Sequence, residues 1–201
     1  MAAEPETSAA LLTRARAGDP EAFCQLGRQY ENRLLRNACS VCGQAGLAEE
    51  LARETMVEAW KSLHRYDGRC QFFTWLCAIL LHRYRNVLRA RHPFPFSALA
   101  RGEHANAIRQ LENLPDTRSA PDEAAQRAER ALLLRRSLER LPARQREVVY
   151  LRFYVDESLE SIAAALRCSV GTVKSRLFHG LEKLRAMREL NLATELEKGK
   201  S

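Results

Sequence analysis

The chain lacks long apolar runs and has little glycine and few β-branched residues, and each shortage excludes a class of protein. No stretch approaches the roughly 18 apolar residues that a transmembrane helix needs, so we expect no membrane insertion. The first ten residues, MAAEPETSAA, lack the basic and apolar segments of a signal peptide, which favours a cytoplasmic location. Only nine glycines occur among 201 residues, and Ala, Leu, Arg and Glu dominate. This composition predicts an all-α protein.

Patterns typical of catalysis and metal binding are also missing. We find no glycine loop that would cradle a nucleotide, no paired carboxylates and no nucleophile beside a base, so we expect neither an enzyme nor a cofactor. Six cysteines are present, of which Cys39 and Cys42 form a C-x-x-C pair. Zinc needs about four ligands and no second Cys/His pair follows closely, so no metal site is predicted. The thiols are expected to be reduced, and sensing of metal or redox state by Cys39 and Cys42 stays open.

Positive charge is abundant, with 32 Lys and Arg against 25 Asp and Glu and a formal net charge of +7. An excess of this size favours a polyanionic partner such as nucleic acid or a membrane surface.

Helical periodicity falls into two blocks separated by the proline-containing residues 93–122, which have no sustained apolar period. We therefore expect a disordered N-terminus over residues 1–7, a four-helix domain over 8–92, a flexible linker over 93–122, a second helical domain over 123–190 and a C-terminal tail over 191–201.

The helix boundaries follow from capping residues and prolines. In the first block, helices are expected over about residues 8–17, 20–40, 47–66 and 71–92, with Asp19 as a cap and Pro20 at the first helical position. In the second block, helices are expected over about 122–140 and 142–154, followed by a helix-turn-helix that begins at Ser158. Ser158 caps its first helix and Ser169 its second.

The second helix of this helix-turn-helix has two different faces. Its apolar stripe consists of Val170, Val173, Leu177, Leu181 and Leu184. Side chains that suit base edges and phosphates in a major groove lie away from the stripe: Thr172, Lys174, Ser175, Arg176, His179 and Lys183. Lys174 falls nearer the apolar edge, so we expect Arg176 to read a base and Lys174 to reach a phosphate.

The helix expected over residues 71–92 offers a second nucleic-acid surface. Away from its core stripe it carries aromatic and basic side chains, which single-stranded DNA needs for its bases and phosphates. These residues are Trp75, His82, Arg83, Arg85, Asn86 and Arg89. A core position for Trp75, packed under the first helix of the block, is the alternative.

The helix expected over residues 47–66 is acidic on its outer side, which would repel DNA and favours a protein partner. Ala48, Leu51, Ala52, Thr55, Ala59 and Leu63 form its inner stripe. The outer face consists of Glu50, Arg53, Glu54, Val57 and Lys61, with Trp60 at its margin. An apolar centre with a charged rim is typical of a small interface, although a plain solvated face has the same pattern.

Four strings of this sequence resemble the extracytoplasmic-function (ECF, group 4) sigma factors of bacterial RNA polymerase, members of the sigma-70 family. In the first block, AEELARETMVEAWKSLHRYDG and FFTWLCAILLHRYRNVLRAR resemble conserved region 2. In the second block, LPARQREVVYLRF and ESIAAALRCSVGTVKSRLFHGLEKLR resemble region 4, with GTVKSRL as the most specific part. The resemblance covers roughly residues 8–92 and 127–188.

The resemblance implies a role for each face. Region 2 docks on the β′ coiled coil of core RNA polymerase, and it recognises and melts the −10 promoter element with its last helix and the preceding loop, here residues 66–71, which include Arg69. Region 4 places its second helix in the major groove at the −35 element and binds the β flap. A sigma factor also binds core as a monomer, and a partner anti-sigma factor is expected to cover the exposed faces of both blocks.

Four residues depart from the family pattern. Glu50 stands where the family commonly has aspartate, and Arg53 where it has glutamine. His82 stands where the family usually has asparagine, and Asn86 where many members have aspartate. The changes at His82 and Asn86 bear on which −10 bases are preferred. The alternative function is a stand-alone helix-turn-helix regulator, possibly with thiol or metal sensing, which would use only the second block and would bind palindromic duplex DNA as a dimer.

Overall fold

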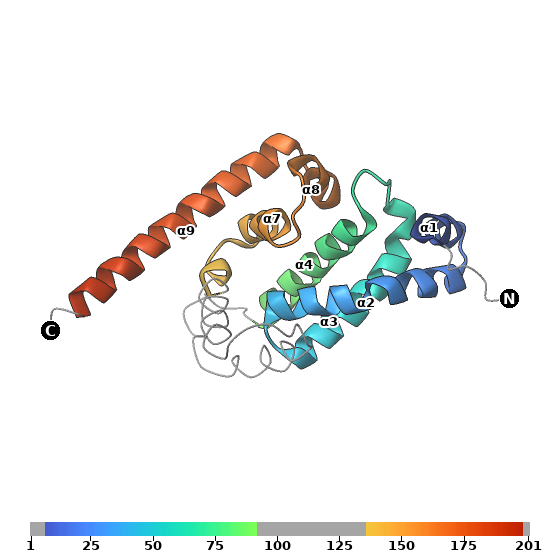
Figure 1. Ribbon diagram of the computed structural model, residues 1–201, viewed down its shortest axis with the longest axis horizontal. Helices are drawn as coiled ribbons and strands as arrows, with labels where there is room; N and C mark the ends of the chain where they lie inside the picture. Colours follow the sequence, from blue (N-terminus) through green and yellow to red (C-terminus); the bar gives the residue numbers. More distant parts are fainter. Residues whose placement is uncertain (1–6, 92–135, 199–201) are drawn as a thin grey trace, which may run out of the picture. The chain divides into compact units, whose positions relative to one another are not determined.

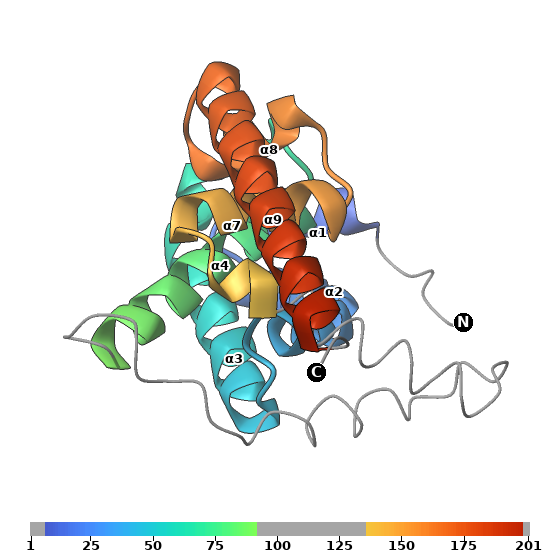
Figure 2. The ribbon, with the colours of Figure 1, turned by 90° about the vertical axis from the view of Figure 1, so that its left-hand side faces the viewer.

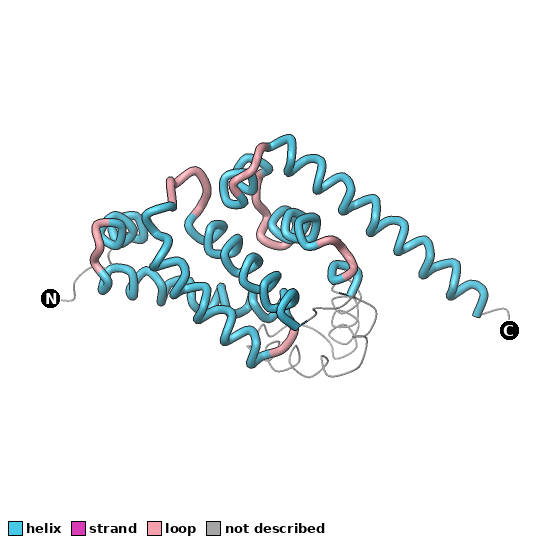
Figure 3. The backbone as a smooth tube through the Cα atoms, turned by 180° about the vertical axis from the view of Figure 1, so that it is seen from behind, coloured by secondary structure: helices cyan, strands magenta, loops and turns pink. Residues whose placement is uncertain are grey.

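The structure is a computed structural model that describes residues 7–91 and 136–198, with the side chains of 7–90 and 136–187. Within these ranges the chain forms helices and loops and no strand, as Figure 3 shows, so the expected all-α class is confirmed. The chain divides into two units, each described here by itself. The predicted linker over 93–122 and most of the predicted helix over 122–140 lie outside the described residues.

The first unit consists of α1 (Ser8–Arg16), α2 (Pro20–Cys42), α3 (Ala45–Ser62), the 3₁₀ turn η1 (Leu63–Arg65) and α4 (Phe72–Arg91). Helices α2, α3 and α4 pack against one another, and α1 lies against α2 (Figure 1). The largest fully buried side chains of this unit are aliphatic: Leu11, Leu26, Leu34, Leu51, Leu76 and Leu80. The inner stripe predicted for α3 is confirmed, because all of its members are buried except Ala52, which is half-buried.

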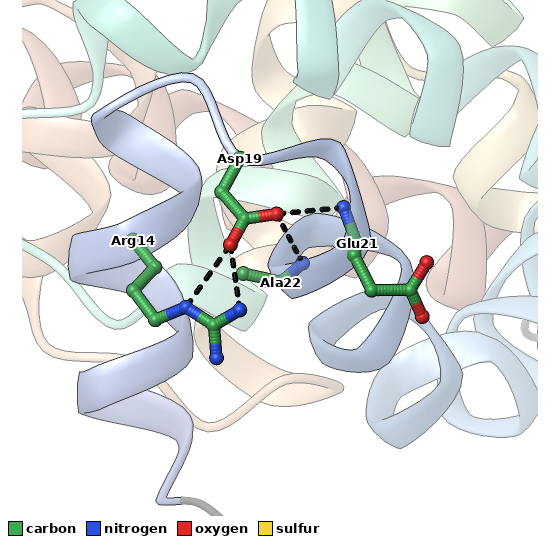
Figure 4. Close-up of polar contacts among 4 residues, drawn as sticks. All are labelled: Arg14, Asp19, Glu21 and Ala22. Carbon is green, nitrogen blue, oxygen red and sulfur yellow. Dashed lines mark hydrogen bonds and ion pairs between the residues drawn. The ribbon is translucent and has the colours of Figure 1, made fainter.

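The junction between α1 and α2 is held by Asp19, as Figure 4 shows. Its Oδ1 accepts from the backbone N–H groups of Glu21 at 3.0 Å and Ala22 at 3.2 Å, which confirms the predicted cap. Its Oδ2 accepts from Nε of Arg14 at 3.0 Å and from Nη2 at 2.6 Å. The Arg14 guanidinium and these backbone groups hold the pKa of Asp19 below its usual range. One carboxylate thus ties the end of α1 to the start of α2.

The second unit consists of α7 (Ala143–Phe153), α8 (Leu159–Leu166) and α9 (Val170–Lys198), which all contact one another. Ser158 Oγ accepts from the backbone N–H of Ser161 at 3.0 Å, and Ser169 Oγ accepts from that of Thr172 at 3.1 Å. Both predicted caps are therefore confirmed. Helix α9 is the long helix in the foreground of Figure 2. It extends to Lys198, so most of the predicted tail over residues 191–201 is helical.

Gly180 brings α9 close to α7. A Cβ built at this buried position would lie 3.0 Å from Cγ2 of Val149, a side chain of α7 that is itself buried. A larger residue would therefore require the Val149 side chain to shift by a few tenths of an ångström. This close approach determines how α9 is rotated about its own axis, and so which of its side chains reach solvent.

Candidate nucleic-acid and protein interfaces

The N-terminal part of α9 carries most of the residues predicted to contact the −35 element. Lys174, Ser175, His179 and Lys183 are exposed, as the sequence predicts for a surface that meets DNA. The side chain of Thr172 is half-buried, and its Oγ1 lies 2.9 Å from the capping hydroxyl of Ser169. Nδ1 of His179 lies 3.4 Å from a carboxylate oxygen of Glu182. The exposed residues form a basic and hydroxyl-bearing surface on one helix.

The exposures of Arg176 and Lys174 are the reverse of those expected, because Lys174 is the more exposed of the two. Arg176 is half-buried, with Nη1 3.9 Å from Sγ of Cys168, whereas Lys174 is exposed. The expectation centred the inner face on the apolar stripe, but Val173 and Gly180 are the two buried positions among residues 170–187 of α9, where side chains are described. At about 100° per residue, Arg176 lies roughly 60° from Val173 and Lys174 roughly 100°. The close approach at Gly180 thus turns Arg176 inward, and the expected order of exposure is wrong.

Phe178 belongs to the exposed surface of α9, although the pattern of polar residues along the helix did not indicate it. It is 59% exposed, and its ring meets the ring of His179 edge-on with a centroid distance of 5.4 Å. The available signal was its place in the helix, because it is about 140° from Val173 and outside the apolar stripe. An exposed aromatic ring beside the exposed His179 is suited to apolar contact with a base edge such as a thymine methyl group.

The C-terminal half of α4 carries the exposed residues predicted for it. His82, Asn86 and Arg89 are exposed and follow each other at spacings of four and three residues, so they share one side of the helix. Arg85 is half-buried. Arg83 is also half-buried, and its Nη2 lies 2.7 Å from Oε2 of Glu54 on α3. This ion pair connects the predicted DNA face of α4 to the predicted protein face of α3.

Trp75 does not lie on an exposed face, and that expectation is wrong. Its side chain is 7% exposed, with ring centroids 5.2 Å from Tyr66 and 5.7 Å from Phe72. The reason is that α4 is covered on every side at its start, where residues 72–78 are all buried. The alternative of a core tryptophan was nearer to the structure, although the aromatic neighbours come from residues 66 and 72. Trp75 therefore packs against Tyr66, the first residue of the loop before α4.

The loop over residues 66–71 is ordered by its own hydrogen bonds. The Tyr66 hydroxyl donates to the backbone carbonyl of Cys70 at 2.6 Å, and Asp67 Oδ1 accepts from the backbone N–H of Arg69 at 3.1 Å. Burial raises the pKa of Tyr66 to about 12. Gly68 has φ +78, a conformation that favours glycine. The Arg69 side chain extends into solvent, with Nε 3.4 Å from Asp67 Oδ2.

The outer face of α3 matches the predicted pattern of an apolar centre in a charged rim. Val57 is 50% exposed and Trp60 is 36% exposed, with Glu50 and Arg53 exposed nearby on the same helix. The Trp60 ring lies 5.1 Å from that of Phe23 on α2, so one side of the indole is supported and another meets solvent. Glu54 is half-buried because of its pairing with Arg83.

The cysteine pair is less accessible than a sensing role requires. Cys39 and Cys42 are buried near the end of α2, and Sγ of Cys42 lies 3.4 Å from the carbonyl oxygen of Gln44. A sensing thiol must be reached by its oxidant or metal, so this burial disfavours the role. Among the described residues, no group of three or more His, Cys, Asp or Glu is arranged to hold a metal ion. No helix in the described ranges is both long and apolar enough to span a membrane.

Comparisons with known proteins match two separate parts of the chain to family models. The family described as Sigma-70 region 2 matches residues 26–93, and that described as Sigma-70, region 4 matches residues 131–184. The chain is 30% identical over 174 residues to the RNA polymerase sigma-H factor of Pseudomonas aeruginosa, covering 87% of this chain and 90% of that protein. It is 28% identical over 187 residues to the ECF RNA polymerase sigma-E factor of Escherichia coli, covering 90% and 94%.

Two solved structures share the fold. CnrH, in complex with the cytosolic domain of CnrY, matches with a TM-score of 0.54 and 23% identity, covering 90% of this chain and 96% of that chain. The sigma factor RpoE of Bartonella quintana, in complex with the anti-sigma factor NepR, matches with a TM-score of 0.53 and 21% identity, covering 83% and 96%. At these identities the likeness bears on the fold alone.

Proposed function

Because this chain belongs to the extracytoplasmic-function group of the sigma-70 family of RNA polymerase sigma factors, we propose that its two helical units divide promoter recognition between the surfaces described above. The chain is an alternative sigma factor: it binds core RNA polymerase and directs it to promoters, and it is not itself an enzyme. The observation that carries the residue-level proposal is that each unit presents its own exposed polar and basic surface, on α4 in one and on α9 in the other.

In the second unit, α9 enters the major groove of the −35 element. Ser175 and Phe178 face the base edges, because they lie roughly 160° and 140° from the buried Val173, and the exposed His179 follows Phe178 in the helix. Lys174 and Lys183 reach phosphates beside the groove. A base contact by Arg176 would require its guanidinium to leave Cys168. The β flap of the polymerase is the expected protein partner of this unit.

In the first unit, the loop over residues 66–71 and the exposed side of α4 hold unpaired bases of the −10 element. The hydrogen-bonded loop provides a rigid rim, and His82, Asn86, Arg85 and Arg89 offer donors and charges beyond it. Arg83 contributes through its pairing with Glu54. Trp75 is left out of this surface because its ring is buried.

The outer face of α3 docks on the β′ coiled coil of core polymerase. Val57 and the solvent-facing part of Trp60 supply the apolar centre, and Glu50, Arg53 and Glu54 supply the rim. The two solved structures that share this fold contain their proteins bound to CnrY and to the anti-sigma factor NepR. By analogy, an anti-sigma factor covers these surfaces until the chain is needed, and the chain acts as a cytoplasmic monomer when free.

Comigration with core polymerase tests the function as a whole. The chain is expected to form a one-to-one complex with bacterial core RNA polymerase on size-exclusion chromatography, and to confer promoter-specific run-off transcription on it. The stand-alone regulator predicts instead a free dimer that binds palindromic duplex DNA. A chain that elutes apart from core and binds such duplexes by itself would replace the sigma assignment with the regulator.

Substitutions in α9 should separate phosphate contacts from base contacts. Lys174→Ala is expected to weaken holoenzyme binding to all promoter sequences alike and to reduce the slope of log K against log salt by about 0.9, because one phosphate contact is lost. Phe178→Ala is expected to remove about 1–3 kcal/mol of preference at one −35 base pair, since its exposed ring supports no core. Binding titrations on promoters selected from random DNA measure both effects. Unchanged base preference in Phe178→Ala would exclude this ring from −35 readout.

A further inference from the structure

Five aromatic side chains form a continuous cluster beside the loop over residues 66–71. Tyr30 of α2 lies 5.6 Å from Phe72 and 5.9 Å from Phe73, measured between ring centroids. Phe72 in turn lies 5.6 Å from Tyr66, and Trp75 lies against both. The cluster therefore connects α2 to the loop and to the start of α4. The −10 surface proposed for the loop and α4 includes no residue of α1 or α2.

Arg33 of α2 lies on one edge of this cluster. Its Cζ is 3.8 Å from the centre of the Phe73 ring, a cation–π arrangement, yet the Arg33 side chain remains exposed. Within the described parts of the chain no carboxylate pairs with its guanidinium. Because the residue stays exposed beside the ring, N–H groups of the guanidinium are available to an acceptor from solvent.

Arg16 is the last residue of α1, a helix that contacts the 3₁₀ turn η1 directly before Tyr66. Burial raises the pKa of Tyr66, and the charge of Arg16 is close enough to oppose that rise. Arg16 is exposed, and within the described residues it too has no carboxylate partner. Arg69 extends from the loop itself, 80% exposed at its side chain. Arg33 thus contacts the aromatic cluster, while Arg16 and Arg69 are exposed on the helix and the loop that adjoin it.

We propose that Arg33, together with Arg16, binds phosphates of the unpaired non-template strand on the α1–α2 side of the loop. This inference rests on the proposed function and extends it, because it places a second strand contact on the side of the loop away from His82 and Asn86. A base held at the loop has a phosphate on each side. Residues of α4 can reach the phosphate on one side of that base, so the phosphate on the other side needs a different partner. Arginine suits a phosphate in this position because its planar group stacks on a ring while its edge donates hydrogen bonds.

The test is holoenzyme binding to a promoter fragment that is pre-melted over the −10 element, titrated at several salt concentrations. Arg33→Ala is expected to lower affinity by about three- to tenfold at low salt and to reduce the salt slope by about 0.7, the value for one contact with a single strand. Arg33→Lys should keep the slope. Arg28→Ala, an exposed arginine about 140° away on α2, should leave both quantities unchanged.

Two outcomes would overturn the proposal, and they are distinguishable from failure of the −10 assignment. If Arg33→Ala unfolds at lower temperature but retains the wild-type salt slope, Arg33 only covers Phe73. If Arg33→Ala matches the wild type in every respect, the residue has no role in strand binding. In either case, the assignment of the −10 bases to α4 would stand if a variant with substitutions at His82 and Asn86 fails to open promoters. Failure of that variant to show any defect would count against the −10 surface itself.

Discussion

Val57→Asp is expected to lower the affinity of the chain for core RNA polymerase by at least about 2 kcal/mol, or roughly 30-fold, while its thermal unfolding stays unchanged. Half of the Val57 side chain is exposed, so the fold gains little from it. In the complex the same side chain becomes the desolvated centre of a charged rim, where an unpaired carboxylate is costly. Fluorescence titration of labelled chain with core polymerase measures the change.

Val57 is a cleaner probe than its neighbours because they also support the fold. Glu54 pairs with Arg83, and Trp60 packs on Phe23, so substitution of either affects stability as well as binding. Ala10→Asp is the matched control, since it adds the same charge at an exposed position on α1. Normal core binding by Val57→Asp would mean that the outer face of α3 is an ordinary solvated surface. Equal losses in both variants would indicate a general effect of charge.

The double variant His82→Ala and Asn86→Ala is expected to reduce run-off transcription from a duplex promoter by about tenfold or more, with −35 binding unchanged. Holding an unstacked base is worth roughly 1–3 kcal/mol, and loss of that energy raises the cost of opening the duplex. Both side chains are exposed, so the substitutions should leave the fold intact. A template pre-melted over the −10 element should recover part of the activity, because the cost of opening is already met.

Permanganate footprinting of the same complexes locates the defect. The variant should show fewer reactive thymines in the −10 region of the duplex promoter, and a normal footprint at the −35 element should accompany the loss. Equal deficits on the duplex and pre-melted templates would place the defect after opening. Wild-type opening by the double variant would show that the exposed side of α4 does not hold the −10 bases.

Local signals in the sequence determined where the helices begin and end. Asp19, Ser158 and Ser169 each cap the helix predicted for them, because a cap depends on a side chain and on backbone groups within three residues of it. The inner stripe of α3 followed from periodicity alone, since a helix has to bury its apolar side. The family resemblance added the division into region 2 and region 4, which the comparisons support.

Only the tertiary structure decided which side chains near the sites reach solvent. Trp75 is buried because neighbouring residues cover the start of α4 on all sides, a fact that the periodicity of one helix does not contain. Arg176 turns inward and Phe178 outward because Gly180 allows α9 to approach Val149, and a residue without a side chain does not enter an apolar stripe. The pairing of Arg83 with Glu54 likewise needs two helices, 29 residues apart in sequence, to be packed side by side. Each of these outcomes depends on how two helices meet, so patterns within a single helix did not predict it.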